Sequence, residues 1–439
     1  MKRTPSPLQA ARFALAAGAL AVYPLRPAPA AGQSQSFAEA ASAPGPTLET
    51  AGEPKVRTVT AFVRLERARL REQIAEAVAM LGRARAAYEA AGYEVQSVRI
   101  STQPFPEYAA GLSRADALSL FRRLDSLSAD GGFALNIGPA MASDPADPDE
   151  ADLLGDILVA TGSLSGSVAV AGPDGVHWEA VLRAARIMRR LADETPGGIG
   201  NFNFGAESFV PADTPFYPAS YSARGGPGRR FAVGLQSANT VAAAFAGADG
   251  PDDARARLKA ALGGHARRIE AIAWDVEART GWAYAGLDLS PAPMGPVSIG
   301  AAIESLIEVP IGSPGTLSAA ALITSVLRDL PVQRAGYSGL MIPVLEDSVL
   351  ARRWSEGTLT LQGLLAYSSV CASGLDTVPL PGDVTVEELA RIIGDVASLA
   401  VRYHKPLTAR LMPVPGKAPG DRTEFDSPFI RNVTLHPVR

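Results

Sequence analysis

The chain has 439 residues and a net charge of −4; 47% of the residues are hydrophobic and 20% are charged. This balance is typical of a soluble globular protein, and it excludes the clustered basic surface of a nucleic-acid-binding protein. The single cysteine excludes an intramolecular disulfide, and none of the four histidines has the spacing of a zinc site.

The first 30 residues have the features of a secretory signal peptide. Lys2 and Arg3 precede the apolar run FALAAGALAVYPL, and the small residues APA that end at Ala30 supply a cleavage site. The run is shorter than the roughly 20 apolar residues of a membrane-spanning helix. We therefore expect residues 1–30 to be removed and the protein to be exported to the periplasm or beyond, without membrane contact afterwards.

Residues 31–55 are rich in Ala, Ser, Pro and Gly and have almost no large apolar side chains. Such a stretch cannot offset its ordering entropy by burial, so we expect a disordered linker. No similar linker interrupts residues 56–439, which predicts one large domain.

Strands and helices alternate along that domain. The expected strands are Val56–Val63, Glu94–Ile100, Phe133–Ile137, Ser167–Val170, Phe231–Gln236, Trp282–Leu289, Gly339–Leu345 and Leu407–Pro413. The expected helices are Glu66–Ala91, Ser113–Leu127, Ala151–Val159, His177–Asp193, Asp252–Thr280 with an interruption at Gly263-Gly264, Pro296–Glu308, Gly315–Leu327, Leu361–Val370 and Thr385–Tyr403. This alternation predicts about eight to ten parallel strands with right-handed crossovers, in one large sheet or a closed barrel.

Four loop-like segments carry the candidate site residues, because ligands of such folds bind at loops beyond strand ends. The first is 198–221, where Asn201, Asn203, Glu207 and Tyr217 are suited to hold a polar ligand. The alternative is a long surface loop packed on itself, but loops of this length are often functional.

The second and third segments place carboxylates after strands. In 286–290, Asp288 and Ser290 either face a site or belong to a turn. In the turn, the Asp288 carboxylate would accept hydrogen bonds from backbone N–H groups. In 339–350, Glu346 and Asp347 either belong to the site or begin a helix, where acidic residues suit the dipole. We favour the site for Glu346 and the helix for Asp347.

The fourth segment, 370–383, contains Cys371, Asp376 and Asp383. Cys371 is either a thiolate activated by a neighbouring base or cation, or a buried free cysteine. Carboxylates also recur at Asp288, Glu304, Glu346, Asp376 and Asp383. They would hold Mg²⁺ or Ca²⁺ only if folding gathered them, so we assign no metal and leave the cofactor unknown.

Five irregular motifs occur in one order: NFNFGAESFVPADTPFYPASY, GLDLSPAP, SGLMIPVLEDSVLA, YSSVCASGLDTVPLPGD and KPLTARLMPVPGK. Together they resemble a bacterial and archaeal family, domain of unknown function 711 or uncharacterised protein family 0210, from about residue 57 to residue 429. The resemblance implies an α/β barrel similar to the fold of pyruvate formate-lyase and other glycyl radical enzymes. It implies no radical chemistry, because the R-V-x-G motif is absent near the C-terminus. The chain also reads C-A-S-G from Cys371, where the family typically reads C-G-T-G.

These observations lead to two main functional hypotheses. In the first, the protein is an enzyme acting on a small polar or carboxylated metabolite. Arg410 would hold the acid group, Glu207, Asp288 or Asp376 would move protons, and Cys371 would line the pocket or attack. In the second, it is a non-catalytic periplasmic protein that binds a small molecule. A structural or assembly role is a third, weaker hypothesis, and a homo-oligomer stays open.

Overall fold

The computed structural model describes residues 52–142, 146–223, 225 and 228–438. The expected signal peptide and most of the expected linker lie outside these residues. Among the helices that are described, none is both long and apolar enough to span a membrane.

The described strands form one ten-stranded sheet in the order β8-β7-β1-β2-β3-β4-β6-β10-β9, with β5 added beside β4. The strands are β1 (Lys55–Val63), β2 (Val98–Thr102), β3 (Ala134–Ala140), β4 (Leu164–Gly172), β5 (Gly175–Val176), β6 (Phe204–Ser208), β7 (Arg230–Gln236), β8 (Ala283–Asp288), β9 (Gly374–Pro381) and β10 (Leu407–Val414). Because β8 and β9 are the two edges, strand pairing does not close the sheet. The expected closed barrel is therefore not what the pairing shows.

The sheet is mixed rather than wholly parallel. Neighbours among β1, β2, β3, β4 and β6 pair in parallel. β7 is antiparallel to β1, and β10 is antiparallel to β6, although β7 and β8, and β9 and β10, are parallel pairs. The expectation of parallel strands throughout was wrong at these two pairings, because the chain reverses direction between β6 and β7 and the later strands keep the reversed direction.

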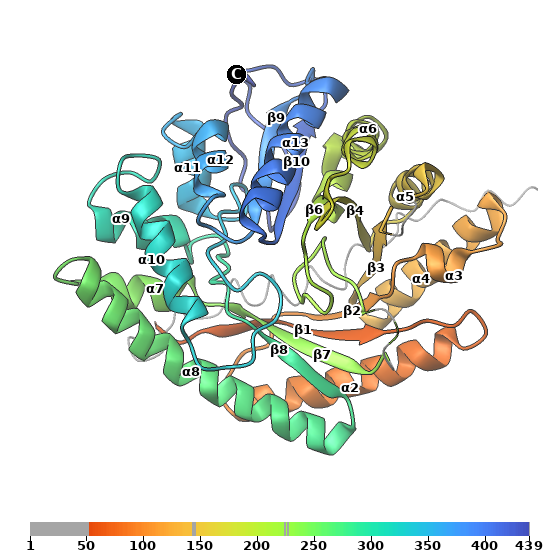
Figure 1. Cartoon of the computed structure of the whole chain (residues 1–439), viewed down its shortest axis with the longest axis horizontal. Helices are drawn as coiled ribbons and strands as arrows, with labels where there is room; N and C mark the ends of the chain where they lie inside the picture. Colours follow the sequence, from red (N-terminus) through yellow and green to blue (C-terminus); the bar gives the residue numbers. More distant parts are fainter. Residues whose placement is uncertain (1–51, 143–145, 224, 226–227, 439) are drawn as a thin grey trace, which may run out of the picture. The chain divides into compact units, whose positions relative to one another are not determined.

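Helices cover the outer side of the curved sheet (Figure 1). They are α2 (Leu70–Ala90), α3 (Pro106–Ala109), α4 (Arg114–Gly131), α5 (Pro148–Ala160), α6 (Trp178–Glu194), the 3₁₀ helix η1 (Pro196–Asn203), α7 (Ala238–Phe245), α8 (Pro251–Thr280), α9 (Ile299–Ile307), α10 (Thr316–Arg328), α11 (Ser348–Ser355), α12 (Leu361–Tyr367) and α13 (Val386–Tyr403). The apolar stripes of many of these helices pack on the strands, as Ile74 and Leu81 of α2 and Val59 of β1 do in the main core, whereas α7, α9, α10 and α11 pack mainly on other helices. This layer is where most apolar burial stabilises the fold.

The sheet curls so strongly that distant strands face one another. Arg57 on β1 and Arg410 on β10 both contact the carboxylate of Glu346, although five strand steps separate β1 from β10. In a flat sheet those strands would lie roughly 24 Å apart. The concave face therefore forms an interior of its own.

The segment 333–344 spans the gap between the two edge strands. Leu287 of β8 donates its N–H to the Gln333 carbonyl at 2.8 Å, and Val344 donates to the Asp376 carbonyl of β9 at 3.0 Å. Only isolated bridges form here, at Arg334 and at Pro343. The expected strand Gly339–Leu345 was therefore wrong, because this stretch crosses the gap instead of extending the sheet.

The loop 211–222 inserts into the concave side. Thr60 donates to the Pro215 carbonyl at 3.0 Å, and the hydroxyls of Ser101 and Ser220 lie 2.6 Å apart. A side chain at Gly205 of β6 would place its Cβ 2.9 Å from Pro218, so glycine permits this close approach. The concave face is thus lined by polar side chains that bond this loop.

Three local expectations were wrong. The helix α8 runs without a break from Pro251 to Thr280, through Gly263 and Gly264. The segments 198–221 and 370–383, expected to be loops, contain the strands β6 and β9. Tertiary packing overrides the weak helix preference of the glycines and the loop-like composition of both segments.

Candidate functional site

Five charged side chains meet on the concave face: Arg57, Arg99, Glu346, Asp376 and Arg410. We call them the arginine–carboxylate cluster. Arg410 donates from Nε to Asp376 Oδ1 at 2.7 Å, and its Nη2 contacts both Asp376 Oδ1, at 2.6 Å, and Glu346 Oε1. Arg57 Nη2 lies 3.7 Å from Glu346 Oε2. Two carboxylates therefore share one guanidinium nitrogen, and a second arginine approaches one of them.

Local strand irregularities bring these side chains to one face. The pairing of β1 with β7 shifts register between Val56 and Thr58, at Arg57. The pairing of β10 with β9 shifts between Ala409 and Leu411, at Arg410. A bulge of this kind bends the strand and changes the direction of the side chain at the extra residue.

The cluster is enclosed but not sealed from water. The side chains of Arg410, Arg57, Glu346 and Asp376 are 8%, 11%, 12% and 18% exposed. Burial raises the pKa of Asp376; Arg410 opposes this change and the Glu346 carboxylate adds to it. Burial alone would lower the pKa of Arg410, but the charges of Asp376 and Glu346 outweigh it and raise that pKa.

Arg99 has no carboxylate within ion-pair distance among the described residues. Its guanidinium lies over the ring of Tyr217, 4.9 Å from the centroid, and Nε donates to Ser97 Oγ at 3.4 Å. Burial, followed by the charge of Arg57, lowers the pKa of Arg99 to about 10. Since three guanidiniums face two carboxylates, the cluster keeps one uncompensated positive charge.

Glu207 on β6 is a second candidate for acid–base chemistry on the same face. It is 5% exposed, and its carboxylate accepts one hydrogen bond, from Ser167 at 2.8 Å. Burial raises the pKa of Glu207 to about 7, and the Ser167 hydroxyl only partly opposes this shift. Its register partner Thr408 lies 2.6 Å from the hydroxyl of Tyr337. A carboxyl with a pKa near 7 is suited to gain and lose a proton at neutral pH.

Asp288, in contrast, is saturated by neutral donors. Its carboxylate accepts hydrogen bonds from the backbone N–H groups of Ser290, Tyr337 and Ser338 and from the Ser290 hydroxyl, all between 2.6 and 3.0 Å. Burial raises the pKa of Asp288, and these donors oppose the change. Asp288 and Ser290 thus hold the segment 333–344 against β8.

Cys371 is fully buried in the main hydrophobic core. The ammonium of Lys405 donates to the backbone carbonyls of Ser368, Ser369 and Cys371 beyond the end of α12. Burial lowers the pKa of Lys405. A cation at this position stabilises the end of the helix, and the structure gives the thiol no exposed surface.

The other predicted residues lie apart from the cluster. Asn201 is buried and donates to the Met188 carbonyl of α6 at 3.0 Å. Asn203 is half-buried at the end of η1, and Asp383 is exposed beyond the end of β9. Glu304 is bound by Arg353 at 2.7 Å. Within the described ranges, no three His, Cys, Asp or Glu side chains form a group that could hold a metal ion.

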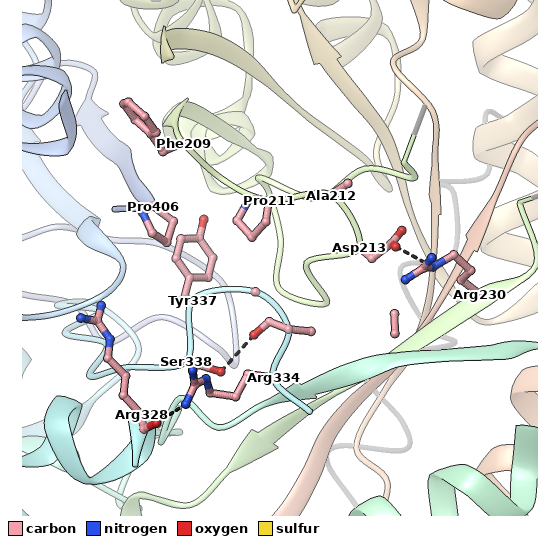
Figure 2. Close-up of a pocket in the computed structure, with 13 residues that line it drawn as sticks. Phe209, Pro211, Ala212, Asp213, Arg230, Arg328, Arg334, Tyr337, Ser338 and Pro406 are labelled. Atoms are coloured by element: carbon pink, nitrogen blue, oxygen red, sulfur yellow. Dashed lines mark hydrogen bonds and ion pairs between the residues drawn. The ribbon is translucent and has the colours of Figure 1, made fainter. Parts of the chain in front are cut away.

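A pocket of about 420 Å³ opens at the other end of the sheet, where β6 finishes and β7 and β10 begin (Figure 2). Its one carboxylate, Asp213, is held by Arg230 at 2.7 Å. Arg328 and Arg334 are exposed on its wall, and Tyr337 lies between this pocket and Thr408. The pocket is basic, but it does not contain a pair of carboxylates.

The geometry therefore combines residues from distant predicted segments. Asp376, Glu346 and Arg410 lie together, and Tyr217 lies beneath Arg99. Sequence reasoning missed Arg57 and Arg99. Each is a long cationic side chain in a strand that is otherwise β-branched or apolar, VRTVTAFV and SVRIST. That pattern was the available signal, because a buried arginine in a strand requires a partner.

These features define a mixed α/β protein in which a curved sheet holds a charged cluster on its concave face. The family described as "Uncharacterised ACR (DUF711)" matches residues 50–426. A UPF0210 protein of Syntrophobacter fumaroxidans is 31% identical over 359 residues, 76% of this chain and 77% of that protein. The chain therefore belongs to the DUF711 family, as its motifs indicated.

Two relatives from Pyrobaculum have higher identity over shorter stretches. The UPF0210 protein of Pyrobaculum arsenaticum is 37% identical over 257 residues, and that of Pyrobaculum aerophilum is 34% identical over 279 residues. The matched stretch spans 56% of the first relative's length and 61% of the second's. The names of these relatives state no activity.

Proposed function

We propose that this chain is an exported enzyme that uses the arginine–carboxylate cluster for acid–base chemistry on a small polar or carboxylated metabolite. The observation that supports this proposal is the carboxylate pair on Arg410. Asp376 and Glu346 contact the same guanidinium nitrogen, and Asp376 is 18% exposed to solvent. Two carboxylates this close cannot both ionise without cost, so one of them holds a proton more readily than an isolated carboxylate does.

Asp376 is the better candidate for the proton-transferring group. Its pKa is raised by burial and by Glu346, while Arg410 fixes the orientation of its carboxylate through Nε and Nη2. Such a group accepts a proton from a substrate carbon or oxygen and returns it later in the cycle. Glu207, with a pKa of about 7, is a second proton carrier on the same face.

The test begins with the full-length chain expressed in a bacterium that exports proteins. The intact mass of the recovered protein reports whether residues 1–30 have been removed. The purified protein is then incubated with pooled carboxylated and hydroxylated metabolites, and consumption is followed by mass spectrometry. We expect at least one compound to be consumed, and Asp376→Asn to lower its turnover about 100-fold or more, as loss of a general acid or base does.

Asp383→Asn is the matched control. It removes a carboxylate from an exposed turn beyond the same strand, β9, and we expect wild-type turnover. Turnover that is unchanged in Asp376→Asn would exclude the proposed chemistry. A compound that binds saturably but is never converted would instead identify a small-molecule-binding protein.

A further inference from the structure

The excess positive charge of the cluster is the feature that the acid–base proposal leaves unexplained. Arg57, Arg99 and Arg410 contribute three positive charges, whereas Asp376 and Glu346, when both are ionised, contribute two negative ones. All five side chains are at least partly withdrawn from water. An uncompensated charge in such surroundings is costly, so its retention calls for an anion from outside the chain.

Arg410 is not the arginine that such an anion would bind. Its Nε and Nη2 are occupied by Asp376 and Glu346, and Nη1 points to the Phe202 carbonyl at 3.3 Å. Its guanidinium also lies over the Phe202 ring, 4.8 Å from the centroid. We expected Arg410 to bind the carboxylate of a ligand, but its donors are occupied, so a different arginine must bind it.

Arg57 and Arg99 have the free donors. Among the described residues, Arg57 Nη1 makes only long contacts, 3.4 Å to Gln96 Oε1 and 3.7 Å to Met294 Sδ, and Nη2 lies 3.7 Å from Glu346 Oε2. Arg99 makes one long hydrogen bond and rests on Tyr217. A guanidinium carries five N–H donors, so most donors on both arginines are available for a ligand.

We infer that Arg57 and Arg99 together bind the carboxylate group of a small monocarboxylate ligand. This inference rests on the proposed function, since it names the group that orients the substrate. One carboxylate supplies the single negative charge that the cluster lacks, and a planar guanidinium matches its two oxygens. A phosphate dianion would leave the cluster with an excess negative charge instead.

The position of this clamp orients the ligand. Arg57 contacts Glu346, which shares Arg410 with Asp376, so a carboxylate on Arg57 and Arg99 lies next to the carboxylate pair. The rest of a short ligand then faces Asp376. The ring of Tyr217 holds the Arg99 fork in place, because stacking limits its rotation.

Binding is measured by calorimetry and by thermal unfolding with sodium acetate, sodium lactate and inorganic phosphate at matched ionic strength. We expect acetate or lactate to bind the wild-type protein and raise its Tm. Arg99→Met and Arg57→Met should each weaken that binding about 10- to 100-fold, the effect of losing hydrogen bonds to a charged group. Arg123→Met, on the exposed face of α4, is the matched control and should bind as the wild type does.

The ligand-free Tm separates loss of binding from loss of folding. Arg99→Met keeps an apolar stem over Tyr217 and removes an uncompensated charge, so its Tm without ligand should equal or exceed that of the wild type. Arg99→Lys keeps the charge but lacks the planar fork, and it should fold normally and bind weakly. Equal carboxylate affinity in the wild type and Arg99→Met would overturn the inference. So would phosphate binding without carboxylate binding, or no binding of any of the three anions.

The two proposals fail in different ways. Carboxylate binding that depends on Arg99, with no metabolite ever converted, would leave this inference standing and remove the acid–base enzyme. Turnover that depends on Asp376 but is unchanged in Arg99→Met and Arg57→Met would support the acid–base enzyme and overturn the carboxylate clamp of Arg57 and Arg99.

Discussion

Two carboxylates in this molecule, the fully buried Asp288 and the partly buried Asp376, are held in opposite ways. Asp288 is fully buried and accepts four hydrogen bonds from three backbone N–H groups and one hydroxyl. Asp376 is partly exposed; its carboxylate is bound mainly by the Arg410 guanidinium, which it shares with Glu346, and also by the backbone N–H of Thr377. Sequence alone had placed both residues in the same candidate site.

The two carboxylates differ in whether the charges and hydrogen bonds around them can change without moving the backbone. The backbone donors around Asp288 cannot move without moving the segment 333–344, so that carboxylate is fixed and structural. The charges around Asp376 are set by three arginines and two carboxylates, which a proton or an anion can rebalance. A buried carboxylate is therefore a better candidate for chemistry when its partners are shared charges than when they are dedicated N–H groups.

The largest effect should come from Asp288→Asn. An amide has one oxygen where the carboxylate has two, so its NH₂ group would face a buried backbone N–H donor such as that of Tyr337 or Ser338. Together with the loss of charge-assisted bonds, we expect unfolding to become easier by about 4 kcal/mol. Urea unfolding at neutral pH measures this change. A loss below about 1 kcal/mol would show that the turn tolerates an amide.

Glu207 lies between these two cases: it is buried, and within the described part of the chain its carboxylate has one neutral side-chain donor, Ser167, and no cation in contact. Its pKa is about 7 in the folded protein, above the ordinary glutamate value of 4.5, so the folded state binds the proton more tightly. The stability that this proton supplies is complete below pH 4.5 and is lost as the pH rises through 7. Glu207→Gln resembles the protonated form at every pH. It should therefore gain about 2–3 kcal/mol over the wild type at pH 8.5 and almost nothing at pH 4.5.

Urea midpoints for the wild type and Glu207→Gln at the two pH values test this prediction. Asp383→Asn, which changes an exposed carboxylate, should show no such difference. An equal effect of Glu207→Gln at both pH values would mean that the substitution changes protein stability through side-chain packing and not through the proton on Glu207.

Local sequence patterns predicted the elements that pack apolar side chains against helices. The strand expected at Val56–Val63 and the helix expected at Thr385–Tyr403 agree closely with β1 and α13. The strands β6 and β9 were missed because their patterns are unusual. In β6, Gly205 and Glu207 are on the concave face, so this face of the strand carries no apolar side chain. β9 contains prolines, which an edge strand tolerates.

The candidate site was only partly visible for a related reason. Asp376, Glu346 and Arg410 could be proposed because each lies in an irregular motif. That Arg410 binds both carboxylates depends on the pairing of β9 with β10 and on the bridge between Pro343 and Asp376, which no local pattern encodes. Arg57 and Arg99 were missed because both lie in segments whose sequence has an ordinary strand pattern, in which periodicity treats an arginine as a solvent-facing position.

The smallest expected stability change is the sharpest test of the comparison, because Asp376→Asn makes the same substitution as Asp288→Asn at another buried carboxylate. The amide keeps an acceptor for Arg410 and removes the repulsion between Asp376 and Glu346, which is stabilising. It also leaves three guanidiniums facing one carboxylate, which is destabilising. These opposed effects should leave the free energy of unfolding within about 1 kcal/mol of the wild type, measured in urea at neutral pH. A loss as large as that of Asp288→Asn would make Asp376 a structural anchor as well, and any loss of turnover in this variant would then follow from damage to the cluster and not from the missing proton carrier.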